Sequence, residues 1–473
     1  MDYRTETDSI GEKEVPKERY YGVQSLRAAE NFQITGRKMC PAFIESLVQI
    51  KKAAAIANSG AGLLSRKLAG AVTQACDEII AGGLREEFIV DPIQGGAGTS
   101  ANMNANEVIA NRAIELLGGK KGDYNLVNPN DHVNMGQSTN DVYPTAGKIT
   151  VLKLLPELKG ELVRLRKVLQ EKAEEFDDVV KMGRTQLQDA VPIRLGQEFK
   201  AYASMICRDL RKIEDLDEKL KVINMGGTAI GTAINADPNY FCKIVPSIEA
   251  VTGLELTQAE DLIDATQNVD VFVTVSSVIK ICAVNLSKMC NDLRLMSSGP
   301  RTGFGEINLP ARQNGSSIMP GKVNPVIPEV VTQIAYHIVG NDLTISMAAE
   351  AGQMELNAFE PIIFHDLFES ISTLTGGIRT LIDHCIGGIT ANRQKCSELL
   401  NSSVGIVTAI APYIGYRKAA EIAKVAISSG NSVKSVLLGK GIMEAAQINN
   451  ILDPARMTRA DGEQNETRHY APK

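Results

Sequence analysis

The stretch that decides the fold runs from Asp264 to Met296 and reads DATQNVDVFVTVSSVIKICAVNLSKMCNDLRLM. Its apolar residues recur at intervals of three and four, which places them on one face of an α-helix. A helix of ~30 residues would be ~45 Å long at about 1.5 Å per residue, far longer than the average helix. The apolar residues are Val269, Phe272, Val273, Val275, Val278, Ile279, Cys282, Leu286, Met289, Leu293 and Met296.

Four other segments carry the same periodicity, at residues 144–178, 195–222, 329–349 and 360–382. An apolar stripe on a long helix must be covered by other helices, so the fold class we predict is mainly α, with a long helix bundle. The stripe between Asp264 and Met296 is wide. We therefore expect other chains to cover it as well, the alternative being one long helix packed within its own chain.

The composition is that of a soluble globular protein. Of the 473 residues, 44% are hydrophobic and 22% charged, while aromatics make up 5% and Trp is absent, so we expect an aliphatic core. A net charge of −6 gives no general basic surface for nucleic acid or anionic lipid. The N-terminus has no apolar signal segment, and residues 399–416 are uncharged but too polar for a membrane span.

Cysteines and histidines argue for a reducing compartment without a metal site. The eight cysteines are scattered with no Cys-x-x-Cys pair, so we expect reduced thiols and a cytoplasmic location. The five histidines show no His-x-x-x-His spacing, so no zinc site is expected. We interpret His337 as a core histidine, and His132 as structural or part of a secondary anion site.

One loop stands out between the periodic segments: residues 313–325 read QNGSSIMPGKVNP. Its prolines and glycines exclude a helix or strand interior, and it offers hydroxyls, one ammonium and backbone N–H groups to an anion. A plain surface turn is one alternative. A nucleotide-binding P-loop is excluded by spacing, because five residues separate Gly315 from Gly321 and Val323 follows Lys322.

Three further segments share this chemistry, at residues 98–100, 137–140 and 185–186. Each presents hydroxyl or amide donors, and together they contain hardly any metal ligand. Many neutral donors and one lysine suit a small carboxylate, whereas a phosphate site would show more arginine or a helix-opening glycine loop.

These motifs resemble those of the aspartase/fumarase superfamily of lyases. Residues 315–325, GSSIMPGKVNP, are similar to its signature, and residues 98–104, 137–141 and 181–190 match three other blocks in the same order. The resemblance covers about residues 10–455. It implies a three-domain fold: an N-terminal domain at 1–140, a central helical-bundle domain at 141–391 and a small C-terminal helical domain at 392–473.

The resemblance also implies a homotetramer whose active sites are each shared by three chains, acting on a small molecule without metal or cofactor. The expected reaction eliminates ammonia from L-aspartate to give fumarate, by removal of a Cβ proton and through an aci-carboxylate. Ser316 is the expected base and Lys322 the cation beside it, with Glu329 as a partner of Lys322 or the loop. The expected substrate-binding residues are Thr99, Ser138, Thr139, Asn140, Thr185, Gln186, Ser317 and Asn324.

Position 186 bears on the choice between reactions. Class II fumarases resemble this chain around Gly183 to Thr185 but typically carry His where this chain has Gln186. Expelling hydroxide requires a proton source, whereas an ammonium group leaves as neutral ammonia, so a neutral amide suffices. Two alternatives stay open: a class II fumarase that hydrates fumarate, and a catalytically silent structural homologue.

Overall fold

The computed structural model describes residues 2–458, so residues 459–473 of the predicted C-terminal domain lie outside the described residues. The chain forms two compact units. Unit 1 contains the described residues up to 159, together with 211–281 and 336–375; unit 2 contains 160–210, 282–335 and the described residues from 376 onward. The three-domain division with boundaries after residues 140 and 391 remains a prediction.

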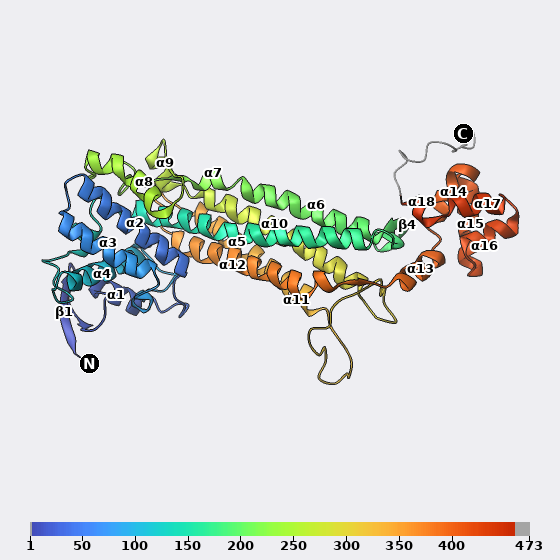
Figure 1. Cartoon of the computed structure of the whole chain (residues 1–473), viewed down its shortest axis with the longest axis horizontal. Helices are drawn as coiled ribbons and strands as arrows, with labels where there is room; N and C mark the ends of the chain where they lie inside the picture. The colour runs from blue at the N-terminus through green and yellow to red at the C-terminus, as the bar shows by residue number, and fades with distance from the viewer. Residues whose placement is uncertain (1, 459–473) are drawn as a thin grey trace. The chain divides into compact units, whose positions relative to one another are not determined.

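Long helices dominate the chain, which confirms the mainly α fold class. Five long helices, drawn in Figure 1, each contain residues of both units. They are α5 (Thr139–Glu175), α6 (Leu195–Glu214), α10 (Asp270–Met296), α11 (Val326–Glu350) and α12 (Glu360–His384).

The predicted single helix from Asp264 to Met296 was wrong at its start. A short helix, α9 (Leu262–Gln267), precedes α10, and Asn268 between them has an extended backbone. The Asn268 side-chain amide donates to Asp264 Oδ1 at 2.6 Å, an example of a polar side chain competing with helical hydrogen bonding. Among the described residues, α10 alone is long and apolar enough by composition to cross a membrane. Phe272 and Ile279 on its stripe are buried within the protein, as in a core helix.

Helix α5 begins at Thr139, five residues before the predicted start, and contains Pro144. A proline inside a helix removes one N–H donor and leaves the carbonyl four residues earlier without its partner. That carbonyl belongs to Asn140, and it accepts instead from the Asn224 side-chain amide at 3.0 Å. The loop that carries Asn224 thus compensates for Pro144, and it fixes the start of α5.

Unit 1 also contains a hairpin, several shorter helices and a two-stranded parallel sheet. In this unit α2, α3 and α4 pack side by side, and α8 packs against α2 (Figure 1). The elements are β1 (Tyr3–Asp8), β2 (Gly11–Pro16), α1 (Val23–Asn31), α2 (Pro41–Gly60), α3 (Arg66–Ile80), η1 (Arg85–Glu87), α4 (Thr99–Leu116), η2 (Pro129–Val133), α7 (Asp217–Leu220), β5 (Val222–Ile223), α8 (Pro238–Thr252), β6 (Thr257–Gln258) and α9.

The core of unit 1 departs from the expected aliphatic packing at one place. A cluster of aromatic rings joins α2, α5, α10 and α12, with Phe364 of α12 at its centre. Phe364 lies 4.8 Å from the Phe272 ring and 5.3 Å from the Tyr143 ring, centroid to centroid. Gly147 permits this approach, because a Cβ there would lie 2.2 Å from Phe364. These ring contacts hold the four helices against one another.

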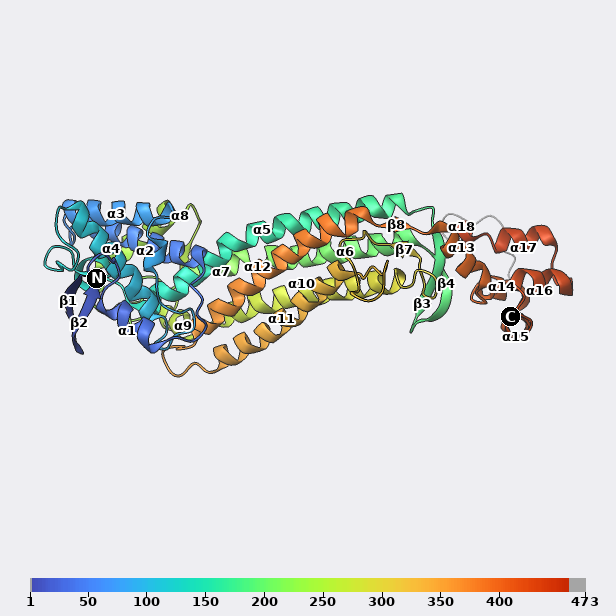
Figure 2. The ribbon, with the colours of Figure 1, turned by 90° about the horizontal axis from the view of Figure 1, so that it is seen from below.

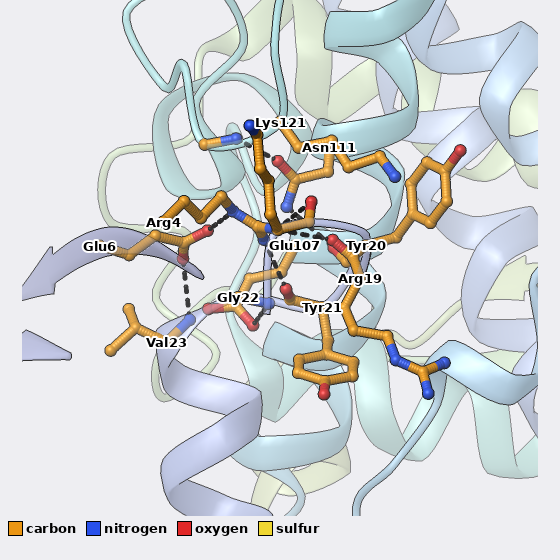
Figure 3. A network of polar contacts seen from close by, with 12 residues as sticks. Arg4, Glu6, Arg19, Tyr20, Tyr21, Gly22, Val23, Glu107, Asn111 and Lys121 are labelled. Atoms are coloured by element: carbon orange, nitrogen blue, oxygen red, sulfur yellow. Dashed lines mark hydrogen bonds and ion pairs between the residues drawn. The ribbon is translucent and has the colours of Figure 1, made fainter. Parts of the chain in front are cut away.

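A buried carboxylate ties the N-terminal segment to α4 (Figure 3). Glu107 accepts from the backbone N–H groups of Gly22 at 2.8 Å, Gln24 at 2.9 Å and Ser25 at 3.1 Å. The Ser25 hydroxyl donates to the same carboxylate. Burial nevertheless raises the pKa of Glu107 to about 7. The N–H groups of Gln24 and Ser25 at the start of α1 are thus satisfied by a residue from α4, while the Val23 N–H donates to Glu6 Oε2 at 2.9 Å.

Unit 2 combines segments of the long helices with a hairpin and the C-terminal helices. In this unit α5 and α12 lie side by side (Figures 1 and 2), where Arg164 and Asp383 form an ion pair at 2.7 Å. The other elements are β3 (Val180–Thr185), β4 (Gln188–Arg194), β7 (Ile307–Asn308), η3 (Ile386–Gly388), β8 (Thr390–Ala391), α13 (Arg393–Ser402), α14 (Val407–Ile414), α15 (Tyr416–Ser429), α16 (Val433–Lys440), α17 (Ala445–Ile451) and α18 (Pro454–Met457). A cluster including Leu400, Ile410, Ile422 and Leu437 forms the core of the C-terminal helices, and Met182 of β3 joins it.

Candidate active site

The loop between β7 and α11 has a defined fold in unit 2. The Gly315 N–H donates to the Lys322 carbonyl at 2.8 Å, and the Asn324 side-chain amide donates to the Gly315 carbonyl at 2.8 Å. A Cβ at Gly315 would lie 2.8 Å from the Lys322 carbonyl oxygen, so only glycine fits. Asn324 therefore closes the loop with one of its amide hydrogens, in addition to any contact it makes with a ligand.

Ser316 lies inside this closed loop and is partly buried. Its Oγ accepts backbone N–H groups from Ile318 at 3.2 Å and Met319 at 3.0 Å. These are the local bonds of a serine turn, and they point two N–H groups at the hydroxyl oxygen.

Lys322 and Ser317 are exposed on the same loop. The Lys322 ammonium forms no ion pair within residues 2–458, and no ion pair joins it to Glu329 on the first turn of α11. The ammonium is thus available to an anion, and the expected pairing with Glu329 stays a prediction.

Thr185 and Gln186 lie at the tip of the β3–β4 hairpin, and both are exposed. Gln186 and Leu187 form the two-residue turn with φ of 52° and 61°, a left-handed conformation that most side chains avoid. Strain of this kind gathers at functional sites, where the surrounding structure maintains it.

The base of the hairpin is held by buried charges. Glu306, which is fully buried, pairs with Arg184 at 2.8 Å and Lys181 at 3.1 Å, and Lys181 also pairs with Glu198 at 2.9 Å. The Arg184 guanidinium also stacks 4.1 Å from the centre of the Phe304 ring. A buried ion-pair network of this kind fixes the orientation of the hairpin.

In unit 1, Thr99 of the predicted site is the first residue of α4. Gly98, which precedes it, has φ of 88°, and a Cβ there would lie 2.4 Å from the Tyr143 ring. This glycine turn lets α4 begin at Thr99, whose side chain is exposed. The N–H groups of Thr99 and Ala101 are already bonded, to the Gly96 carbonyl and to Gln94 Oε1, both at 2.9 Å.

The segment from Ser138 to Asn140 is bonded to α4 through Asn102. The Asn102 amide donates to Thr139 Oγ1 at 3.1 Å and to Asn134 Oδ1 at 3.2 Å. Because Thr139 Oγ1 accepts this bond, its own hydrogen is free to be donated to an anion. Asn140, by contrast, already donates its side-chain amide to the Ala229 carbonyl at 2.7 Å.

Two buried charges, Lys51 and Asp141, lie beneath this segment, and neither was among the predicted site residues. The Lys51 ammonium donates to Asn134 Oδ1 at 2.7 Å and Gln137 Oε1 at 2.9 Å. The Asp141 carboxylate accepts from the Ser138 N–H at 2.9 Å, and from two N–H groups of the 226–228 loop. Burial lowers the pKa of Lys51 to about 7 and raises the pKa of Asp141 to about 6.

The two histidines of the sequence analysis have different environments. His132 Nδ1 accepts from the Asn128 N–H at 2.9 Å, which is a structural contact within η2. The prediction that His337 is a core histidine was wrong. Its side chain is half-exposed, and Nε2 lies 3.1 Å from Glu369 Oε2.

Each unit therefore holds part of the predicted site. Unit 1 brings Thr139 together with Asn102 of α4, and residues 99 and 138–140 all belong to it. Unit 2 contains the hairpin turn with Thr185 and Gln186, and the loop with Ser316, Ser317, Lys322, Asn324 and Glu329. Each unit presents neutral donors, and unit 2 adds the Lys322 ammonium, which forms no ion pair with the residues that the structure describes.

Comparisons with known proteins agree with this chemistry. A lyase family matches residues 11–340, and a family described as the fumarase C C-terminus matches residues 406–459. A Bacillus protein named aspartate ammonia-lyase is 52% identical over 457 residues, covering 97% of this chain and 98% of the relative.

Two solved structures share the fold over nearly all of both chains. A Brucella melitensis protein described as fumarate lyase:delta crystallin, bound to cobalt, aligns with a TM-score of 0.94 at 48% identity, covering 97% of this chain and 100% of that chain. A class II fumarase from Schistosoma mansoni aligns with a TM-score of 0.92 at 35% identity, covering 96% of this chain and 99% of that chain. The chain therefore belongs to the aspartase/fumarase superfamily of lyases.

Proposed function

We propose that this enzyme eliminates ammonia from L-aspartate to give fumarate, and that the reaction is reversible. Relatives named aspartate ammonia-lyase support this choice, since one is 52% identical over 97% of the chain. The observation that carries the proposal is the environment of Ser316, whose Oγ accepts two backbone N–H groups in a loop that also carries the unpaired Lys322 ammonium.

The chemical step begins when the Ser316 alkoxide takes a proton from Cβ of aspartate. The electron pair of the C–H bond delocalises into the β-carboxylate, giving an aci-carboxylate with additional negative charge. When this electron pair returns from the β-carboxylate, Cα and Cβ form a double bond. The C–N bond breaks at the same time, and its electrons stay on nitrogen. The amino group thus leaves as neutral ammonia from its protonated form, and no added proton is required.

Stabilisation of the aci-carboxylate is the main electrostatic task. Donors placed where charge develops contribute about 3–4 kcal/mol each in comparable oxyanion sites. We assign Ser138, Thr139 and Ser317 to the β-carboxylate. The hydroxyl of Thr139 supports this role, because the bond from Asn102 leaves its hydrogen to be donated outward.

The remaining donors hold the other end of the substrate. We assign Lys322, Asn324 and Thr185 to the α-carboxylate, where an ammonium and neutral donors match the charge. Thr99, Asn140 and Gln186 are assigned to the amino group.

We further propose a homotetramer whose active sites each draw residues from three chains. An exposed apolar stripe on α11 supports this. It consists of Tyr336, Val339, Leu343 and Met347, which follow helical spacing, and the side chains of Tyr336 and Leu343 are 67% and 63% exposed.

Mixing Thr139→Val protein with Ser316→Ala protein tests whether active sites are shared between chains. If the residues come from different chains, dissociation and reassembly produces some intact sites and restores part of the activity; no recovery after proven exchange of subunits would contradict it.

We propose a cytoplasmic location, which the state of the thiols supports. All eight cysteines are free in the structure, and five of them are buried, which fits a reducing compartment.

An ultraviolet assay of fumarate tests the reaction and separates it from its nearest rival. We expect fumarate to be consumed only when ammonium is present, with L-aspartate as the product. Consumption without ammonium, giving malate, would identify a fumarate hydratase. No consumption under either condition would favour the structural homologue.

A further inference from the structure

Asn102, near the start of α4, connects the candidate active site to the interior of unit 1. Its side chain is 1% exposed. The amide nitrogen donates to Thr139 Oγ1 at 3.1 Å and to Asn134 Oδ1 at 3.2 Å, so both of its hydrogens are used. The amide oxygen is buried and accepts no hydrogen bond within residues 2–458. A buried amide oxygen without a donor is uncommon, so the contacts of the nitrogen must determine which way this amide faces.

Asn134 determines that orientation. Its own Nδ2 donates to the backbone carbonyl of Gln137 at 3.1 Å. A carbonyl can only accept, so the other amide atom of Asn134 is the oxygen, whatever the charge of its neighbours. This oxygen accepts from Asn102, from Asn106 at 3.1 Å and from the Lys51 side chain at 2.7 Å. Turning the Asn102 amide over would bring two oxygens face to face, so its nitrogen stays toward Asn134.

The orientation of Asn102 in turn fixes the polarity of the Thr139 hydroxyl. In the bond between the two side chains, the Asn102 nitrogen is the donor and Thr139 Oγ1 the acceptor. An amide N–H cannot accept, so the hydroxyl hydrogen of Thr139 must point in another direction. Within residues 2–458 this hydroxyl donates no hydrogen bond, and its hydrogen is therefore available to a ligand.

We propose that Asn102 is a positioning residue for the elimination, which directs the Thr139 hydroxyl hydrogen toward the β-carboxylate of the substrate. This role rests on the function proposed above, in which Thr139 donates to that carboxylate. Each bond in the chain that leads from the Gln137 carbonyl to Thr139 has a fixed donor and a fixed acceptor. A donor that is oriented in advance needs no rearrangement when negative charge develops, so its polarity affects the rate of the chemical step.

Asn102→Asp tests the proposal, because a carboxylate has nearly the shape of the amide but can only accept. The Thr139 hydroxyl would then donate to the new carboxylate and turn its lone pairs toward the substrate. We expect kcat for fumarate formation to fall by about 10²–10³-fold, as for the loss of an oxyanion donor. KM for L-aspartate should change much less, since the donor matters most when charge develops. Asn102→Ala leaves the hydroxyl free to rotate, so its loss of kcat should be smaller.

A double-mutant cycle with Thr139→Val separates positioning from general damage. If Asn102 acts through the Thr139 hydroxyl, Asn102→Asp should lower kcat by no more than a few-fold once that hydroxyl is absent. Asn106→Asp is the matched control. Asn106 is equally buried on α4 and donates to the same Asn134 oxygen, but it makes no hydrogen bond to Thr139. Its effect on kcat should therefore be the same with Thr139 and with Thr139→Val.

The wild type is measured first, since failure to form fumarate from L-aspartate would refute the proposed function and the positioning role with it. With an active wild type, the positioning role alone is overturned in either of two cases. One is that folded Asn102→Asp keeps kcat within a few-fold of the wild type; the other is that its loss is equally large in the Thr139→Val background. Urea unfolding verifies the fold of each variant. If Asn102→Asp does not fold, the same cycle with Asn102→Ala decides, and an equal loss in both backgrounds again overturns the role.

Discussion

Replacing Thr139 by Val tests how the carboxylate donors work, because the two side chains have nearly the same shape. Thr139 is 9% exposed, and its hydroxyl accepts from Asn102 but donates no hydrogen bond within residues 2–458. The structural cost is small, since the Asn102 amide keeps Asn134 Oδ1 at 3.2 Å as an acceptor. Losing one of two such bonds costs about 1 kcal/mol of unfolding free energy.

The catalytic cost is expected to be larger. Removing one donor to a developing oxyanion lowers kcat by about 10²–10³-fold, or about 3–4 kcal/mol. The assay is the initial rate of fumarate formation from L-aspartate, measured beside urea unfolding. Thr150→Val is the matched control, because Thr150 is also buried in α5 and its hydroxyl bonds to the Ala146 carbonyl at 2.7 Å. If both variants retain kcat within a few-fold of the wild type, Thr139 does not donate to the reacting carboxylate.

Two further variants test a buried charge and a strained turn. Glu107 has its pKa raised from 4.5 to about 7 by burial, so its stabilising contribution is complete below pH 4.5 and is lost as the pH rises through 7. At about 1.4 kcal/mol per pKa unit, this contribution amounts to about 3 kcal/mol. In Glu107→Gln, the free energy of unfolding should therefore fall by about 3 kcal/mol less than in the wild type between pH 4.5 and 7. If the pH dependence of the variant equals that of the wild type, Glu107 does not titrate in this range. Gln186→Gly relieves the left-handed backbone, so we expect unfolding free energy to change by less than about 1 kcal/mol while turnover falls about tenfold or more through the lost amide. Turnover equal to the wild type would remove Gln186 from the site.

Periodicity predicted the long helices well, and it failed where a local polar contact decides the backbone. The break at Asn268 depends on a side-chain bond to Asp264 that apolar spacing cannot reveal. The early start of α5 depends on Asn224, which is distant in sequence and satisfies the carbonyl freed by Pro144. Such boundaries are set by tertiary contacts, so no local pattern could have placed them.

The donor loops of the site were predictable, and the residues that hold them were not. Ser316, Lys322 and Thr139 lie in segments rich in glycine and hydroxyls, a composition that itself points to anion binding. Lys51 and Asn102 lie in helices, where a polar residue usually predicts a solvent-facing surface. Both side chains are nevertheless buried. The pair Lys51–Lys52, which opens the Ala-rich run of α2, gives no sign of which lysine is buried.

The most direct measurement of the central claim is the turnover of L-aspartate by Ser316→Ala, with the fold and subunit assembly verified. Without the base, we expect fumarate formation to fall by about 10²–10⁴-fold while aspartate still binds, because the carboxylate donors remain. Turnover within a few-fold of the wild type would contradict the account, since Cβ would then lose its proton to another group.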